Sequence, residues 1–251
     1  GSQNNILNLN HAQAAQYSTI KLGGHGYTTG ASVLKAGVNT SISKLEHNNT
    51  AALITGEGTT LTITGNSSSY GGSFGGTVTV DYTGGGTFTL GNSNKGTALT
   101  PASSPDATLK ISSGTLSLFS GNVNWSQKLV MGDGTTLTVQ DGPAVSGYYN
   151  YDATSINGDG FTFSGAATFG TGVNLTTQYG KNIKFTGVLT AASGFSISGA
   201  DSEYTYYTLA GTENQIGGTI AITRNSTSLG INASGSLGTA AVTTSSGNQY
   251  L

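Results

Sequence analysis

The chain has 251 residues, of which 8% are charged and 40 are glycine, whereas charged residues make up roughly 25% of an average soluble domain. Its net charge of −2 is too small to favour nucleic acid or an anionic membrane as a partner. The absence of cysteine excludes disulfides and thiolate chemistry, and a chain of this length can bury a continuous core.

Taken in chain order, residues 1–45 show little regular patterning, whereas residues 46–251 repeatedly alternate apolar and polar side chains with a period of two. The alternating segments are short, and they are bounded by Gly, Asn or Asp, which tolerate the positive φ of tight corners. Each segment offers apolar side chains to one face and Thr, Ser or Lys to the other. We predict strands at 60–64, 77–80, 87–90, 108–111, 115–118, 136–139, 161–163, 183–185, 195–197 and 219–222.

One phrase occurs twice: residues 56–65 read GEGTTLTITG, and residues 132–142 read GDGTTLTVQDG. Comparable strands often recur about every 20 residues, the period of a parallel β-helix. We interpret the phrase as one rung of such a helix, in which Gly turns the corner and two Thr face solvent. The two copies would lie about four coils apart, and the residues entering the interior would be Leu61, Ile63, Leu137 and Val139.

The predicted fold class is therefore all-β, a right-handed parallel β-helix (β-solenoid) of roughly twelve coils. Residues 46–251 would form a single continuous domain. Residues 1–45 would cap it, because the first coil of a solenoid must be shielded from edge-to-edge aggregation.

Two stretches depart from the alternation and are predicted to protrude as loops. Residues 97–106 hold two of the three prolines, and residues 141–159 hold the third together with a cluster of tyrosines. Tyrosine offers a large contact area at a low cost in conformational entropy. We predict binding by this cluster, with packing of the loop against itself as the open alternative; the residues are Tyr148, Tyr149, Tyr151 and Asp152.

A second group of tyrosines is formed by Tyr204, Tyr206 and Tyr207. Successive side chains of a strand point to opposite faces, so one of two adjacent tyrosines would point inward. We therefore favour packing over binding for this group.

The C-terminal part is similar to the passenger-associated repeat of bacterial autotransporters (type V secretion). Residues 208–219 read TLAGTENQIGGT and residues 229–244 read LGINASGSLGTAAVTT. Glu213, Gln215 and Ala240 depart from the pattern, and the residues that match it are Thr208, Leu209, Gly211, Gly217, Gly218, Thr219, Ser236, Leu237, Gly238 and Val242. The resemblance implies a β-helical passenger domain exported across the outer membrane to the bacterial cell surface, where the repeat itself serves secretion.

The sequence offers weak support for catalysis. A glycan-cleaving β-helix would need convergent carboxylates, and four acids lie close in sequence: Asp133, Asp141, Asp152 and Asp159. We favour a turn role for Asp133 in Gly-Asp-Gly and for Asp141 in Gln-Asp-Gly, because Asp is a good turn residue at such corners. The histidines show no metal-ligand spacing; they are His11, His25 and His47. We predict no enzymatic activity, no cofactor and no metal.

We expect a cell-surface adhesin fragment that promotes self-association, biofilm formation or host attachment. Rows of uncharged hydroxyls can add many weak contacts between identical molecules on neighbouring cells. A host glycan or matrix protein is a further candidate partner; nucleic acid and membrane are not. The alternatives are a carbohydrate-binding or carbohydrate-cleaving β-helix of the tailspike or polysaccharide-lyase type and, less favoured because the rungs vary in length, an ice-binding solenoid.

Overall fold

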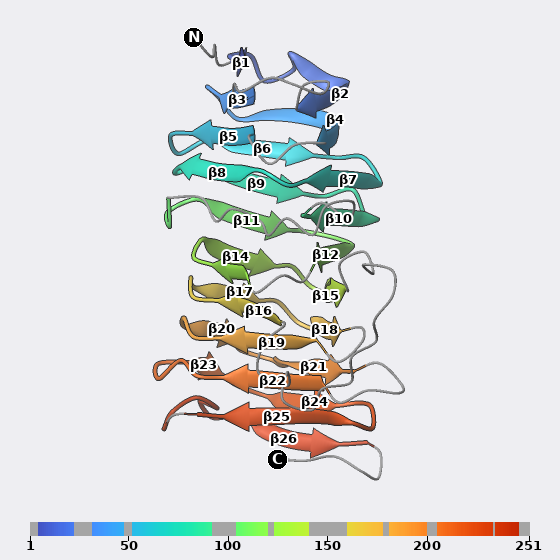
Figure 1. Cartoon of the computed structure of the whole chain (residues 1–251), viewed down its shortest axis with the longest axis vertical. Helices are drawn as coiled ribbons and strands as arrows, with labels where there is room; N and C mark the ends of the chain where they lie inside the picture. The colour runs from blue at the N-terminus through green and yellow to red at the C-terminus, as the bar shows by residue number, and fades with distance from the viewer. Residues whose placement is uncertain are drawn as a thin grey trace, which may run out of the picture.

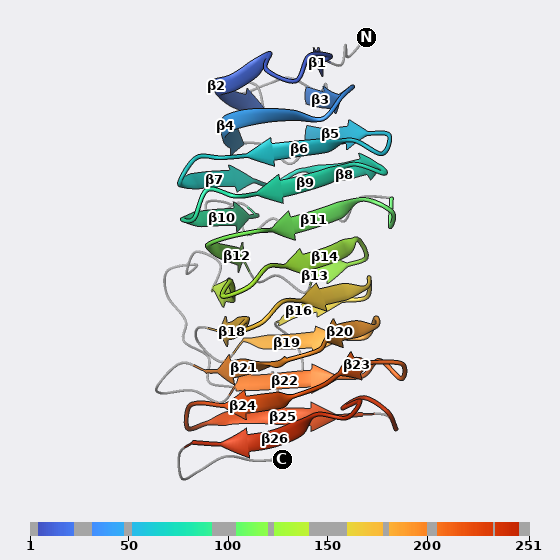
Figure 2. The same cartoon turned by 180° about the vertical axis from the view of Figure 1, so that it is seen from behind.

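The computed structural model describes residues 5–22, 32–47, 52–91, 104–119, 123–140, 160–177, 181–199, 205–232 and 234–245. All regular secondary structure within these ranges is β, in 26 strands. No helix in the same ranges is long and apolar enough to cross a membrane. The strands stack as coils along one axis, with the first and the last described coil at opposite ends (Figure 1; Figure 2 gives the view from behind).

The coil has three sides, and one of them is a nine-stranded sheet. Its strands, in order along the axis, are β2 (Ala15–Leu22), β4 (Thr40–His47), β6 (Thr60–Ile63), β9 (Thr79–Tyr82), β11 (Thr108–Ile111), β14 (Lys128–Met131), β17 (Ala167–Phe169), β20 (Leu189–Ala191) and β23 (Gln215–Ile216).

The second side is an eight-stranded sheet. Its strands are β7 (Ser67–Tyr70), β10 (Thr87–Leu90), β12 (Thr115–Phe119), β15 (Thr136–Gln140), β18 (Asn174–Thr177), β21 (Gly194–Ser198), β24 (Thr219–Ile222) and β26 (Ala241–Thr244).

The third side is divided into two sheets. The four-stranded sheet holds β1 (Asn5–Leu9), β3 (Ser32–Ala36), β5 (Ala52–Gly56) and β8 (Ser73–Gly76). The five-stranded sheet holds β13 (Val123–Trp125), β16 (Gly160–Phe163), β19 (Asn182–Phe185), β22 (Thr205–Leu209) and β25 (Thr227–Ile231).

The predicted fold class is confirmed, because every pairing among these strands is parallel and the sheets close into a β-solenoid. The predicted number of coils was wrong: the solenoid makes about eight turns instead of twelve. Residues that meet across adjacent coils are 20 apart at Thr83 and Ile63, but 29 apart at Lys110 and Asp81. The distance in sequence reaches 38 at Thr171 and Asp133. A chain with such long segments between rungs completes fewer turns.

The N-terminal region supplies rungs of the solenoid. Strands β1 to β4 are the first members of the four-stranded and nine-stranded sheets. Leu7 faces the same interior column as Leu34, to which it is paired in register. Leu34 is fully buried, whereas Leu7 remains 42% exposed because no described coil lies above it.

The core is a set of inward columns in which each strand contributes alternate residues. In the nine-stranded sheet, Leu61, Val80, Leu109 and Leu129 are aligned in register and are all buried. The intervening side chains point outward, as the period of two requires. Burial of one such column across successive coils is what holds the coils in register, because a slip by one residue would turn every apolar side chain outward.

The repeated phrase forms the same kind of corner at two different edges of the coil. Gly58 and Gly134 both have positive φ, at 63° and 66°, and the apolar residues that follow enter the core as predicted. The prediction of equivalent rungs was wrong, because residues 60–63 lie in the nine-stranded sheet and residues 136–140 in the eight-stranded sheet. Thr135 is also buried instead of facing solvent, and its Oγ1 donates to Gly132 O at 2.7 Å.

Threonine and serine side chains stabilise the corners of the coils by hydrogen bonds to the preceding coil. At the end of β9, both the N–H and the Oγ1 of Thr83 donate to Ile63 O of the preceding coil, at 2.9 and 3.3 Å. The same double donation to one carbonyl recurs at Thr64, Ser164, Thr186, Thr223, Thr239 and Ser245. These corner hydroxyls are therefore engaged within the molecule.

A chain of aromatic contacts runs through the interior and crosses the break in the third side. Phe74 of β8 meets Trp125 of β13 edge-on at 5.7 Å between ring centroids, where the four-stranded sheet ends and the five-stranded sheet begins. On the other side of the break, Phe163 stacks on Phe185 at 5.0 Å. Aromatic pairs of this geometry add about 0.5–1.5 kcal/mol beyond area burial, so ring packing compensates for the missing backbone ladder.

Candidate functional site

The outer surface of the nine-stranded sheet between β6 and β20 is the candidate site, and we call it the hydroxyl face. Its outward side chains form two rows, aligned by the parallel register of the strands. The rows contain Thr60, Thr62, Thr79, Asp81, Thr108, Lys110, Lys128, Val130, Thr168 and Thr190. All of them except Asp81 are partly or fully exposed.

The threonine hydroxyls of the hydroxyl face are free, in contrast to those at the corners. No residue within the described ranges accepts from or donates to the Oγ1 of Thr62, Thr108 or Thr168, although each hydroxyl can do both. Adjacent rungs are about 4.8 Å apart. One row carries threonine on three successive rungs, at Thr60, Thr79 and Thr108, whereas in the other row Asp81, Lys110 and Val130 separate Thr62 from Thr168.

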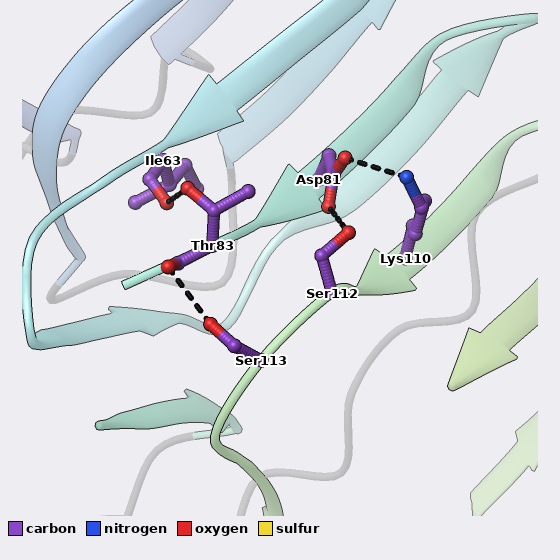
Figure 3. A network of polar contacts seen from close by, with 6 residues as sticks. All are labelled: Ile63, Asp81, Thr83, Lys110, Ser112 and Ser113. Carbon is purple, nitrogen blue, oxygen red and sulfur yellow. Dashed lines mark hydrogen bonds and ion pairs between the residues drawn. The ribbon is translucent and has the colours of Figure 1, made fainter. Parts of the chain in front are cut away.

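The charges on the hydroxyl face are neutralised locally. Lys110 Nζ lies 2.9 Å from Asp81 Oδ2 on the adjacent coil, and Ser112 Oγ donates to Asp81 Oδ1 at 2.7 Å (Figure 3). Asp81 is therefore tied to both an ammonium and a hydroxyl. Lys128 lies 3.8 Å from Asp106. Between β6 and β20 the described part of this face consequently carries no uncompensated charge.

The network around Asp81 also fixes the adjacent corner. Ser113 Oγ donates to Thr83 O at 2.8 Å, and Thr83 in turn donates to Ile63 O (Figure 3). Three coils are thus joined by side-chain hydrogen bonds at the edge of the hydroxyl face. These hydrogen bonds hold the strands together along one edge of the hydroxyl face.

The predicted binding cluster lies outside the described residues. This holds for Tyr148, Tyr149, Tyr151 and Asp152, and also for Tyr204. Most of the two predicted loops, 97–106 and 141–159, falls outside as well.

The tyrosines of β22 behave as the alternation predicts. Tyr207 is buried, and its hydroxyl donates a hydrogen bond of 2.7 Å toward Ser198 O, with Leu175 O at 3.1 Å. Burial raises the pKa of the Tyr207 hydroxyl. Tyr206 faces outward and is half-buried. The packing interpretation is confirmed for Tyr207.

Of the four acidic residues considered for catalysis, Asp133 is the one within the described ranges, and it acts as a corner residue. Its Oδ1 accepts a hydrogen bond from Thr171 N at 2.7 Å, which links two coils. The turn interpretation is confirmed for Asp133; Asp141, Asp152 and Asp159 lie outside the described residues. In the part of the chain that the structure describes, no group of three or more His, Asp or Glu residues could hold a metal ion.

Residues 71–75 read GGSFG, which matches the G-x-S-x-G pattern of a nucleophile elbow. The elbow places its serine on a sharp turn between a strand and a helix. Here Ser73 opens strand β8 directly after strand β7, and the Tyr70 hydroxyl donates to Ser73 O at 2.6 Å. The structural context of the elbow is missing, so the match carries no catalytic assignment.

His47 is a half-buried structural residue. Its Nδ1 accepts a hydrogen bond from Gly71 N at 2.9 Å, and its ring contacts Tyr70 at a centroid distance of 5.2 Å. Desolvation by burial lowers the pKa of His47 to about 4. His11 accepts from Gln13 N in an exposed turn, and His25 lies outside the described residues.

We expect acid to destabilise the protein through His47. Because its folded pKa is about 4 and an unfolded histidine titrates near 6.5, the unfolded chain binds more protons in this interval. The contribution of neutral His47 to the free energy of unfolding is therefore fully present above pH 6.5 and is lost as the pH falls toward 4. After allowance for solvent screening the loss should be about 1–2 kcal/mol. Urea unfolding of the wild type and of His47→Gln across this range should show the extra pH slope in the wild type alone.

The residues that resemble the passenger-associated repeat build the junctions of the last coils. Ser236 Oγ donates to Gly211 O at 3.1 Å. Asn214 bridges two coils, because its Nδ2 donates to Ser236 O and its Oδ1 accepts from Leu189 N, both at 2.8 Å. Asn214 and Ser236 are buried. These residues therefore stabilise the fold at this end.

Comparisons with known proteins leave the chain without an assigned family. No protein-family model matches it, and neither a curated protein nor a solved structure is significantly similar.

Proposed function

We propose that this protein is a non-enzymatic adhesive protein that associates with identical molecules through the hydroxyl face. The observation that carries the proposal is the set of free threonine hydroxyls on an accessible and locally neutral sheet. When two identical copies associate through the same face, like charges face each other across the contact and repel. Association is therefore favoured when each charge is already paired within its own copy. Each hydroxyl contact is weak, but contacts repeated on successive rungs add up.

We further propose that the protein acts on the bacterial cell surface as an exported passenger domain. The resemblance of residues 208–219 and 229–244 to the passenger-associated repeat supports this localisation, and a rod-like solenoid is suited to project a contact surface away from a cell. Self-association between neighbouring cells would promote aggregation and biofilm formation. A host glycan or matrix protein is a further partner of the proposed surface.

Sedimentation velocity over a range of protein concentrations tests the proposal. The double variant Thr62→Glu and Thr168→Glu places uncompensated negative charge on the hydroxyl face of every copy. We expect association to weaken at least tenfold, which corresponds to about 1.4 kcal/mol, with little effect on thermal stability. The matched control is Thr162→Glu, an outward threonine of the five-stranded sheet that is aligned with Lys184.

Two results would contradict the proposal. One is a wild-type protein that stays monomeric at all concentrations. The other is a control variant that weakens association as much as the double variant does.

The ice-binding alternative rests on the eight-stranded sheet and is less well supported. Its outward positions do repeat a hydroxyl-x-hydroxyl pattern, as in Ser67 and Ser69 or Thr87 and Thr89. An ice-binding face must be flat and accessible along its length. Ser117 and Thr138, in the middle of one row, are buried, so the accessible array on this side is interrupted.

A further inference from the structure

A groove lies between β4 and the first two strands of the eight-stranded sheet. The second half of β4, Lys44–His47, pairs with β2, whereas the eight-stranded sheet ends at β7. Leu45 N donates to the side chain of Ser68 at 3.1 Å where a continuous ladder would have used a backbone carbonyl. The backbone ladder is thus interrupted between β4 and β7, and the interruption opens the surface.

The groove is lined by polar and charged residues. Its volume is about 260 Å³, and its lining residues are Lys44, Glu46, Ser67, Ser68, Ser69, Thr87 and Thr89. Ser68 is buried and engaged with Leu45. The hydroxyls of the other two serines and of both threonines have no partner within the described residues. A ligand would therefore meet four unused hydroxyls, each able to donate and to accept.

The charged groups of the lining cancel each other. Lys44 Nζ lies 2.8 Å from Glu46 Oε1, and the ammonium of Lys44 lowers the pKa of the Glu46 carboxyl. A cationic ligand would have to compete with Lys44, and an anionic ligand with Glu46. The lining consequently favours a ligand without net charge.

Hydrogen bonds within the protein hold the walls of the groove in place. Gly71 N donates to His47 Nδ1 at 2.9 Å, which joins the end of β4 to the end of β7. The Tyr70 hydroxyl anchors β7 from the inside, because it contacts Ala52 O and Ser73 O at 3.1 and 2.6 Å. A preformed site of this kind loses little conformational entropy on binding.

We propose that this groove binds a neutral saccharide, with one pyranose ring seated over Ser67, Ser69, Thr87 and Thr89. The four hydroxyls lie on two adjacent strands, about 4.8 Å apart between strands and about 6.7 Å apart along a strand, so a ring placed over them can form hydrogen bonds to both strands. Such a ring presents donors and acceptors on every side and carries no charge, as the lining requires. The four hydroxyls belong to the eight-stranded sheet, whereas the hydroxyl face lies on the nine-stranded sheet between β6 and β20, so the two sites can be tested separately.

Titration of the isotope-labelled chain with cellobiose, maltose and lactose, followed by amide chemical shifts, tests this proposal. Binding by a small polar groove without an aromatic platform should be weak, with a dissociation constant of about 1 mM. We expect saturable shifts at β4, β7 and β10 with at least one of these sugars. Glucuronate and galactosamine, the charged probes, should bind more weakly.

The double variant Thr87→Val and Thr89→Val replaces each hydroxyl by a methyl group of similar shape and should weaken binding at least tenfold. The matched control, Thr162→Val with Thr208→Val at outward positions of the five-stranded sheet, should leave binding unchanged. Ser69→Ala offers a second test if the valine variant does not fold. Absence of saturable shifts with all three sugars, preferential binding of a charged probe, or an equal loss in the control would overturn the proposal.

Discussion

Replacing Phe163 by alanine is expected to lower the free energy of unfolding by about 3–5 kcal/mol. Phe163 is buried, and its ring stacks on Phe185 at an interplanar angle of 13° and contacts Phe161 at 4.8 Å. The columns above and below are locked by parallel pairing of β16 with β13 and β19. Because the neighbouring coils cannot close onto the space, a cavity would remain and add to the lost transfer free energy.

Tyr206→Ala is the matched control, since it removes an outward, half-buried aromatic side chain from β22 in the same sheet. Its cost should be below about 1 kcal/mol, because partly exposed positions away from the core tolerate substitution. Chemical denaturation of both variants measures the difference. Similar losses for the two variants would contradict the role assigned to the aromatic column.

Strand positions were largely predictable because alternation is a local property. The segments that contain Leu61, Leu109 and Ile220 form strands with those side chains inside, as expected. The number of turns was not predictable in the same way. It depends on how many residues separate consecutive rungs, and that separation changes from 19 at Leu61 and Val80 to 38 at Leu129 and Ala167. The amino-acid composition does not indicate how many residues separate consecutive rungs.

The candidate site was only partly foreseen. Alternation identifies Thr62 and Thr138 equally as outward residues, yet in the folded chain Thr62 is partly exposed and Thr138 is buried. The aromatic contact between Phe74 and Trp125 joins strands on either side of a break in the third side. No local pattern marks such a contact, because it depends on how two distant coils stack.

The groove beneath β4 was missed for a related reason. Ser67, Ser68 and Ser69 are a serine run that carries no strand signal of its own. The groove depends on the length of β4, because the second half of β4 pairs with β2 and β7 is left without a backbone partner on that side. A signal was present in the neighbouring segment, where Lys44 and Glu46 alternate around buried Leu45.

Replacing Gly194 by alanine is expected to cost more than about 3 kcal/mol, a combination of backbone strain and overlap with the next coil. Gly194 opens β21 with φ of 75° and is aligned with Thr219 of β24. A Cβ at this position would stand 1.9 Å from Thr219 O. This oxygen belongs to the backbone, so two strands of the eight-stranded sheet would have to separate.

Gly85→Ala separates the two contributions, because Gly85 has nearly the same φ, 78°, but open space around its hypothetical Cβ. Its substitution should cost only the strain of a left-handed backbone, about 1–2 kcal/mol. Thermal and chemical unfolding of the two variants therefore separate the cost of backbone strain from the cost of overlap with the adjacent coil. If both substitutions cost the same, coil spacing would not be limiting at Gly194, and the tight stacking of β21 on β24 would be wrong.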